Sequence, residues 1–255
     1  MMQALLRAES IKIRRHAAVW LPVLAPAVAV GLCFIALAGQ EAPPKLSPDA
    51  IWRALTRNAW ALWLAVFMPM LIAFEAAALV NLEHDGKQWK QLFALPVARS
   101  QVYATKMLLC LALVGASVAA FAIGLIADVL IIGVIHQLPL IATIPWVDIL
   151  GQAARAIAAS ASPMIVLQLW FSVRRRGFAT PVGWGIGALL LGAFLSPIEF
   201  FHSKLWYPWT LPVNTLGGRD VHAMQMAVPV MIGCFGGVPA GVAACWDLAR
   251  RSESD

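Results

Sequence analysis

Charged side chains are scarce in this chain. Only 13% of its 255 residues are charged and 61% are hydrophobic, whereas an ordinary soluble domain carries about 25% charged residues. A soluble core cannot hide so much apolar surface, so the composition excludes the soluble class and predicts an integral membrane protein. The net charge of +6 is then attributed to cytoplasmic loops, where membrane proteins gather basic residues, and no nucleic acid partner is expected.

The motifs of nucleotide hydrolysis and of common hydrolases are also missing. The sequence has no G-x-x-x-x-G-K-[ST] phosphate loop, and its nearest stretch, "DGKQ" at 85–88, lacks the first glycine and the hydroxyl residue. It has no H-E-x-x-H and no G-x-S-x-G motif. The four cysteines lie inside apolar runs without metal or disulfide spacing. We therefore expect no catalytic residue, no bound cofactor and no metal, which disfavours a membrane enzyme.

Six apolar segments approach the length of about 20 residues that an α-helix needs to cross the hydrocarbon. Prolines inside several of them predict kinks, because neighbouring helices can satisfy the freed backbone groups. The segments show no convincing internal repeat, which weakens the case for an inverted-repeat secondary transporter. The fold class expected is an all-α polytopic membrane protein, a single transmembrane domain over 1–255. The six predicted spans are 17–38, 58–80, 107–135, 151–173, 178–195 and 226–247.

The distribution of Lys and Arg orients these spans. With the N-terminus inside, thirteen basic residues fall on the inner side and six on the outer side. This bias predicts that both termini are cytoplasmic. The inner set is Arg7, Lys12, Arg14, Arg15, Lys87, Lys90, Arg99, Lys106, Arg174, Arg175, Arg176, Arg250 and Arg251, and the outer set is Lys45, Arg53, Arg57, Arg155, Lys204 and Arg219.

Two further segments do not fit the pattern of spans. Residues 1–16 alternate apolar positions such as Ile11 and Ile13 with charges such as Glu9, which predicts an amphipathic helix along the inner membrane surface. Residues 196–225 are aromatic but too interrupted by proline to span. Two interpretations of this second segment stay open, namely short helices that dip into the outer leaflet and an aromatic belt at the interface.

Charges and glycines inside the spans are candidates for special roles. Glu75 and Asp128 are intramembrane acidic residues, and such charges are functional candidates because they are expensive to bury. Glycines recur at four-residue spacing on the fifth and sixth spans, which favours close helix packing. The spacing does not reveal whether the partner helix belongs to the same chain. The glycines are Gly183, Gly187, Gly233, Gly237 and Gly241.

The longest cytoplasmic loop, 81–106, reads "NLEHDGKQWKQLFALPVARSQVYATK". Trp89, Leu92 and Phe93 have the spacing of one stripe on a short helix, and Pro96 ends whatever helix precedes it. One interpretation is an interfacial loop with its Trp at the head groups and its Lys residues near anionic lipid. The other is a short helix that docks into a groove of a cytoplasmic partner.

These features together resemble an ABC-2-type transporter permease, especially the compact permeases of lantibiotic and bacitracin immunity exporters. The shared layout is an amphipathic N-terminal helix, six spans, a charged first cytoplasmic loop and a broken aromatic segment before the last span. Glu83 followed by "GKQWKQLFALPVARSQVYATK" is similar to the loop of that family, with its acid, Trp-Lys, Leu-Pro, Arg and Tyr-x-x-Lys. "YPWTLP" at 207–212 resembles the family's Pro-Trp-x-x-Pro.

The resemblance implies that the loop is a coupling helix on a separate nucleotide-binding subunit. It implies a non-enzymatic permease subunit of the bacterial inner membrane, which pairs with itself or a paralogous permease and with a cytoplasmic ABC ATPase dimer that binds ATP and Mg²⁺. The cargo implied is an amphipathic peptide or antibiotic of the lantibiotic kind. A non-transporting scaffold or sensor remains the alternative. The coupling residues implied are Glu83, Trp89, Lys90, Phe93, Pro96, Arg99 and Lys106.

Overall fold

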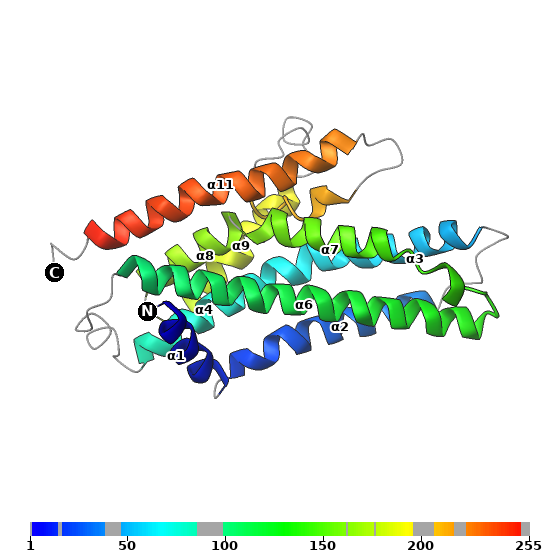
Figure 1. Ribbon diagram of the computed structural model, residues 1–255, viewed down its shortest axis with the longest axis horizontal. Coiled ribbons are helices and arrows are strands. Elements are labelled where there is room, and N and C mark those ends of the chain that lie inside the picture. The colour runs from blue at the N-terminus through cyan, green and yellow to red at the C-terminus, as the bar shows by residue number, and fades with distance from the viewer. Residues whose placement is uncertain are drawn as a thin grey trace.

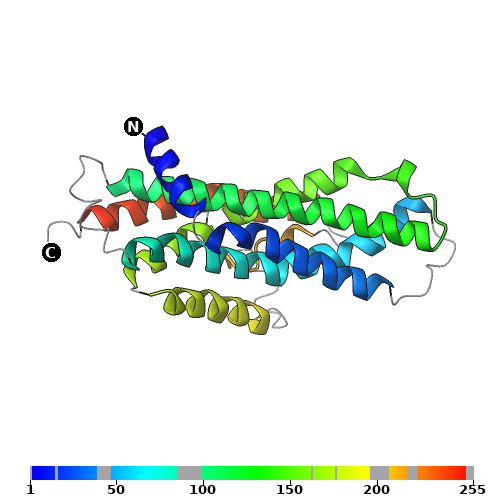
Figure 2. The same cartoon turned by 90° about the horizontal axis from the view of Figure 1, so that it is seen from below.

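The computed structural model describes residues 2–14, 17–38, 47–85, 99–161, 163–175, 177–195, 207–216 and 223–250. These residues form helices joined by turns, and no strand occurs among them. The long helices lie lengthwise in one elongated bundle (Figure 1), and the short N-terminal helix lies obliquely across one end of it (Figure 2). The all-α prediction is confirmed.

The helices follow one another in a simple order. Residues 48–85 form one helical run, in which a single π-helical turn, η2, is the only departure from α-helix. The elements are α1 Met2–Arg14, η1 Ala17–Trp20, α2 Leu21–Ala38, α3 Pro48–Leu62, η2 Trp63–Phe67, α4 Met68–Asp85, α6 Arg99–Ile135, η3 Ile141–Thr143, α7 Trp146–Ala161, α8 Pro163–Arg174, α9 Ala179–Leu195, η4 Val213–Thr215 and α11 Ala223–Arg250.

Helices occupy all six predicted spans. Within the described residues, four helices are long and apolar enough to cross a membrane: Leu21–Ala38, Pro48–Leu82, Ser100–Ile135 and Ala227–Ala244. The bent pair of α7 and α8 would add a fifth span if it crosses as one unit. Helix α9 is apolar but has only 17 residues. The structure thus supports a polytopic membrane protein, with four or five spans fixed by length and composition.

The second span begins ten residues before its predicted start at 58. Ser47 has extended backbone (φ −64°, ψ 149°) and Pro48 follows it in the first turn, where its missing N–H costs no hydrogen bond. Trp52 is fully buried, and its indole Nε1 donates to the Leu140 carbonyl oxygen at 3.3 Å. Arg53 and Arg57 made this stretch look like a loop, but both point away from the core. The stretch is therefore an amphipathic extension of the helix.

The π-turn η2 ends at Phe67, two residues before Pro69. Proline has no N–H to donate to the carbonyl four residues earlier and its ring crowds that carbonyl, so a wider turn at this place keeps the helix continuous. The turn carries Trp63, which is fully buried and stacks on Phe121 of α6 with 4.7 Å between ring centroids. The kink predicted from Pro69 is thus absorbed as a π-turn packed by aromatic rings.

The third span begins at Arg99, so residues 99–106 are helix and not loop as predicted. Val102 and Tyr103 are buried in this first part of α6, and the Tyr103 hydroxyl donates to the Val166 carbonyl oxygen of α8 at 2.7 Å. Because the first residues of this helix are polar, the sequence alone predicted a loop here and did not indicate these contacts. At its other end α6 ends at Ile135. Gln137, two residues further on, has a φ of 56°, which lets Leu138 N–H reach the Gly133 carbonyl oxygen at 2.7 Å.

The continuous helix of α3, η2 and α4 forms the centre of the bundle. In the apolar stretch of this helix that could cross a membrane, 72% of the residues are buried. The corresponding share is 28% for α2 and 22% for α11. The outer helices expose apolar side chains such as Leu24, Ile35 and Phe235. In a membrane protein such faces contact lipid tails, whereas the α3–η2–α4 helix packs mainly against other helices of the bundle.

Residues 207–216, within the predicted outer aromatic segment, are packed inside the bundle. Trp209, Leu211 and Thr215 are buried, and η4 contacts both α7 and α11. The Tyr207 hydroxyl donates to the Ala188 carbonyl oxygen of α9 at 2.6 Å. Burial raises the pKa of the Tyr207 phenol, which keeps this donor protonated. This part of the segment joins helices and is not a belt on their surface.

Candidate functional site

The N-terminal helix α1 presents Glu9 and Ile13 to the bundle. The two residues are one turn apart on the same face of the helix, and each is 3% exposed. Ile11 lies on the other face and is 58% exposed. The buried face of α1 therefore carries a carboxylate, although the sequence alone places Glu9 among the polar, solvated positions.

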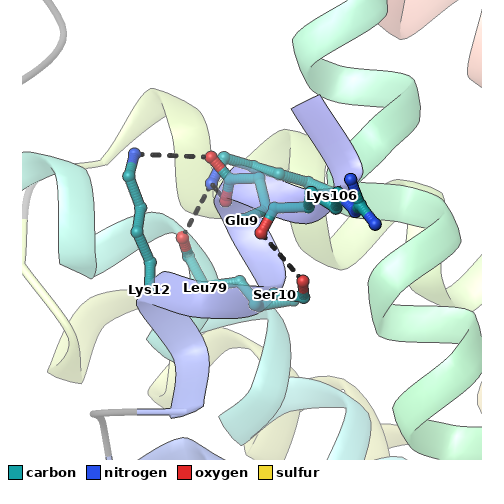
Figure 3. Close-up of polar contacts among 6 residues, drawn as sticks. Glu9, Ser10, Lys12, Leu79 and Lys106 are labelled. Atoms are coloured by element: carbon teal, nitrogen blue, oxygen red, sulfur yellow. Dashed lines mark hydrogen bonds and ion pairs between the residues drawn. The ribbon is translucent and has the colours of Figure 1, made fainter. Parts of the chain in front are cut away.

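Glu9 meets Lys106, which comes from the start of α6. Lys106 Nζ lies 3.1 Å from Glu9 Oε2 and donates to the Leu79 carbonyl oxygen of α4 at 3.0 Å. Figure 3 shows the ammonium group between these two oxygens. Lys106 is 1% exposed, so both acceptors are needed to offset the cost of taking its charge out of water. We call Glu9, Leu79 and Lys106 the Lys106 cluster.

The Glu9 carboxylate has a second cationic partner, the partly exposed Lys12. Lys12 Nζ lies 3.5 Å from Glu9 Oε1, and the Lys12 side chain is 35% exposed. An ion pair this exposed contributes little, because water screens it. The buried partner Lys106 therefore carries most of the energy that holds Glu9.

The Lys106 cluster lies close in sequence to both ends of the segment that connects α4 and α6. The Leu79 carbonyl is six residues before the end of α4 at Asp85, and Lys106 is seven residues after the start of α6 at Arg99. The Lys106 ammonium therefore links the two helices that bound residues 86–98, and it also links them to α1. The start of α6, the end of α4, α1 and the C-terminal end of α11 lie at the same end of the bundle, which we call the α1 end (Figure 1).

The residues implied by the family resemblance divide into two groups at this end. Trp89, Lys90, Phe93 and Pro96 lie outside the described residues. Glu83 lies in the last turn of α4 and Arg99 is the first residue of α6. Lys106 is the one member whose contacts are described, and they join three helices inside the chain. Glu9 was missed by sequence reasoning, and its only signal was the one-turn spacing to Ile13.

A second ionic cluster, formed by Trp170, Arg174 and Asp247, joins α8 to α11 at the α1 end. Arg174 Nη2 lies 2.5 Å from Asp247 Oδ1, and Arg174 Nε donates to Asp247 Oδ2 at 3.3 Å. The Arg174 guanidinium also lies over the Trp170 ring, 3.9 Å from its centroid. About 30% of each charged side chain is exposed, so this contact is weaker than the buried pair.

The two intramembrane acids lie far apart. Glu75 is fully buried, and neither of its carboxylate oxygens has a hydrogen-bond partner among the described residues. It lies one turn before Leu79 on α4. Asp128 lies on α6, 22 residues beyond Lys106, which is about 33 Å along the helix axis, whereas Lys106 contacts Leu79 beside Glu75. The structure does not combine Glu75 and Asp128 into one site.

The glycines of the sixth span pack within the chain. A Cβ on Gly233 would clash with the Ala158 carbonyl oxygen and stand 2.6 Å from Ala159 Cα, so α11 and α7 touch backbone to backbone there. Gly237 is buried on the same helix. A Cβ on Gly241 would lie 3.8 Å from Val166 Cγ2, which is an ordinary contact.

The glycines of the fifth span behave differently. Gly183 and Gly187 have open space where a Cβ would stand, so no helix of the described part of the chain uses them. The close approach of α9 to α4 occurs at Gly185, where a Cβ would stand 2.5 Å from Ala73 Cβ. Gly183 and Gly187 stay predicted packing positions.

An all-α bundle with four apolar helices of spanning length defines the chain as an integral membrane protein. The family model described as ABC-2 family transporter protein matches residues 5–193, from within α1 to within α9. The chain therefore belongs to the ABC-2 family of transporter proteins, as a membrane permease component that works with an ABC ATPase. All three members of the Lys106 cluster fall inside the matched residues. No characterised protein and no solved structure matches the chain.

Proposed function

We propose that this chain is the permease subunit of an ATP-driven exporter in a bacterial cytoplasmic membrane. The segment between α4 and α6, which carries Trp89 and Lys90, docks on the ABC ATPase dimer. The α1 end of the bundle is the cytoplasmic end, with both termini on that side. The excess of basic residues in the inner segments supports this orientation. ATP and Mg²⁺ bind to the ATPase, because this sequence holds no phosphate loop.

The observation that carries the proposal is the Lys106 cluster. It ties α1, α4 and α6 together directly beside the segment that the family resemblance implies as the coupling helix. A displacement of residues 86–98 is therefore delivered to three helices at once, since Lys106 bonds to Glu9 at 3.1 Å and to Leu79 at 3.0 Å. A loose loop between independent helices would dissipate the same displacement.

The displacement then passes through α4 to the rest of the bundle. Helix α4 packs against both α8 and α9 as well as α6, and its residues are the most buried of the spans. ATP binding closes the ATPase dimer and ATP hydrolysis reopens it, so the bundle is driven between two arrangements. We propose Glu75, buried on α4 one turn from the cluster, as a charge whose surroundings change between them.

A second permease, either another copy or a paralogue, completes the transporter. The open face at Gly183 and Gly187 of α9 supports this, because small residues let the backbone of a partner helix approach closely. Trp184 and Leu191 are exposed on the same helix. The proposed cargo is an amphipathic peptide of the lantibiotic kind, a choice supported by the likeness of the loop and of "YPWTLP" to immunity exporters.

The ATPase interface is tested by copurification from the native membrane. Affinity-tagged chain is expected to bring down an ABC ATPase in stoichiometric amount, and Trp89→Ala together with Lys90→Ala is expected to lose it. Trp146→Ala is the matched control, because Trp146 is exposed on α7 at the opposite end of the bundle. A double variant that retains the ATPase at the wild-type level would contradict the docking role, and a wild-type chain that purifies without ATPase would favour the scaffold alternative.

The cargo is tested separately in reconstituted vesicles that contain the permease and its ATPase. An amphipathic cationic peptide should raise the ATPase rate several-fold and be depleted from the membrane only when ATP is present. A soluble peptide of the same charge and without an apolar face is the control. Equal stimulation by both peptides, or by neither, would overturn the cargo assignment without affecting the ATPase interface.

A further inference from the structure

The last part of α11, residues 240–250, packs against the bundle through small side chains. Ala244 is 4% exposed and faces the bundle, whereas Val242 and Trp246 are exposed on the other face. A Cβ on Gly241 would lie 3.8 Å from Val166 Cγ2 of α8, at ordinary contact distance. In a membrane, packing and polar contacts hold helices together, because lipid tails are as apolar as a partner helix. Small side chains supply little packing, so residues 240–250 depend on polar contacts.

The middle of α11 is held more tightly. At Gly233 the backbone of α11 touches the backbone of α7, with Ala159 Cα only 2.6 Å from where a Cβ would stand. The helix contacts η4 as well as α7. One part of α11 is therefore in close contact with its neighbours, and residues 240–250 are not packed in this way.

The polar contact that holds residues 240–250 is the second ionic cluster. The Arg174 guanidinium donates to both carboxylate oxygens of Asp247, and Trp170 Nε1 donates to Asp247 Oδ2 at 3.3 Å. Both partners come from α8. About 30% of each charged side chain is exposed, so water can replace these hydrogen bonds when the contact opens. The cost of opening such an exposed pair is small.

Between Gly233 and Asp247 the helix has a weak point at Gly236–Pro239. Pro239 lies inside α11 and has no N–H to donate to the Phe235 carbonyl oxygen, four residues earlier. Gly236 precedes it, and the nearest atom to a Cβ there would be 3.8 Å away. Proline and neighbouring glycine are the usual causes of a helix bend. The helix can therefore bend between its tightly packed part and the part that the ionic cluster holds.

We propose that residues 240–250 form a hinged arm, which swings away from α8 about Gly236–Pro239 when the contact between Arg174 and Asp247 opens. Residues 223–235 stay against α7 and η4 during this movement. The opening uncovers Val166 of α8 and Ala244 of the arm, both buried in this structure. The second ionic cluster thus controls access to the space between α8 and α11 at the α1 end of the bundle.

The test is a spin-label distance measurement on the purified chain in lipid nanodiscs, with its native cysteines replaced by alanine. One pair of labels is carried on Val242→Cys in the arm and Leu24→Cys of α2. The other pair joins Met231→Cys, before the hinge, to the same position on α2. All three native side chains are exposed. Arg174→Gln is expected to add a second, shifted distance for the Val242 pair and to leave the Met231 pair unchanged.

Arg175→Gln is the matched control, because it removes the same charge one residue further along α8. Arg175 lies over the Phe171 ring, 5.9 Å from its centroid, outside the ionic cluster, so its replacement should shift neither distance. Asp247→Asn replaces Arg174→Gln if that variant does not fold. The asparagine keeps the size of the side chain and removes its charge, and the same shifted distance is expected.

Pro239→Ala tests the hinge itself. The alanine N–H can donate to the Phe235 carbonyl oxygen, so adding this change to Arg174→Gln should reduce the shifted population. Wild-type distances in both Arg174→Gln and Asp247→Asn would overturn the proposal. Equal shifts of the two label pairs would show that α11 moves as a whole, and an undiminished shift with Pro239→Ala would likewise refute the hinge. Neither ATPase nor cargo is present, so the result is independent of the proposed function.

Discussion

Lys106 Nζ and Glu9 Oε2 lie 3.1 Å apart, although 97 positions separate the two residues in the chain. Both side chains are almost fully buried, so the contact is an ion pair inside the protein and not on its surface. It fixes an amphipathic helix that would otherwise be free to move along the membrane surface. The predictions below begin with this pair.

Glu9→Gln should release α1 from the bundle. The substitution leaves the Lys106 charge buried with the Leu79 carbonyl as its main acceptor, and removing one partner of a buried pair costs about 3–5 kcal/mol. Hydrogen exchange of residues 2–14 should speed up in the variant, and its thermal midpoint should fall. Lys12→Gln is the control, since Lys12 is partly exposed, and it should leave both measurements nearly unchanged.

The double variant Glu9→Leu with Lys106→Met separates stability from coupling. Apolar residues of similar volume can replace a buried ion pair at little cost or with a gain in stability, so this variant should fold and keep the thermal midpoint of the wild type. If the ion pair transmits movement, ATPase stimulation by cargo should still fall in vesicles. Normal stimulation in this variant would show that the Lys106 cluster is structural only.

Gly233→Ala should destabilise the bundle. Its new methyl group meets the backbone of Ala158 and Ala159, which cannot move aside as a flexible side chain can, and such overpacking typically costs about 1–3 kcal/mol. Gly236→Ala on the same helix is the matched control, because the nearest atom would be 3.8 Å from its Cβ. A thermal melt that ranks Gly236→Ala below Gly233→Ala would refute the close crossing of α7 and α11.

Gln137→Gly should stabilise the protein. Gln137 has φ of 56° at the end of α6, a conformation in which glycine has no steric penalty. The gain should be about 1 kcal/mol, and it should appear as a rise of a few degrees in the thermal midpoint. Gln137→Ala keeps a Cβ and should show no such rise, which separates the backbone effect from loss of the amide.

The secondary structure follows closely from the sequence, because apolar length determines where a helix can cross a membrane. Helix α9 at Ala179–Leu195 differs by one residue from its predicted start at 178. The errors occur where a helix is amphipathic and continues beyond the apolar run. Pro48–Leu62 and the first turns of α6 carry arginines and lysines that resemble loop residues, and only tertiary contacts such as that of Tyr103 with Val166 make them helix.

The candidate site could be predicted only in part. The sequence singles out Lys106, but it assigns this lysine to a loop surface, because local pattern carries no information about a partner 97 residues away. Four-residue spacing likewise selects glycines on α9 without saying which face is covered. The structure brings Gly185 against Ala73 and leaves Gly183 and Gly187 open. Pairing between distant segments is thus the part that the sequence leaves undetermined.

The separation of Glu9 and Lys106 also sets an order of events during synthesis. When Glu9 is added to the growing chain, Lys106 is still 97 residues from being made, which is a delay of roughly 5–20 s at the usual elongation rate of about 5–20 residues per second. Throughout this interval the carboxylate must stay in water, and α1 has nowhere to dock until α4 and α6 stand side by side. The docking of α1 is therefore a late step. It requires that α4 and α6 already lie side by side with Leu79 and Lys106 in contact.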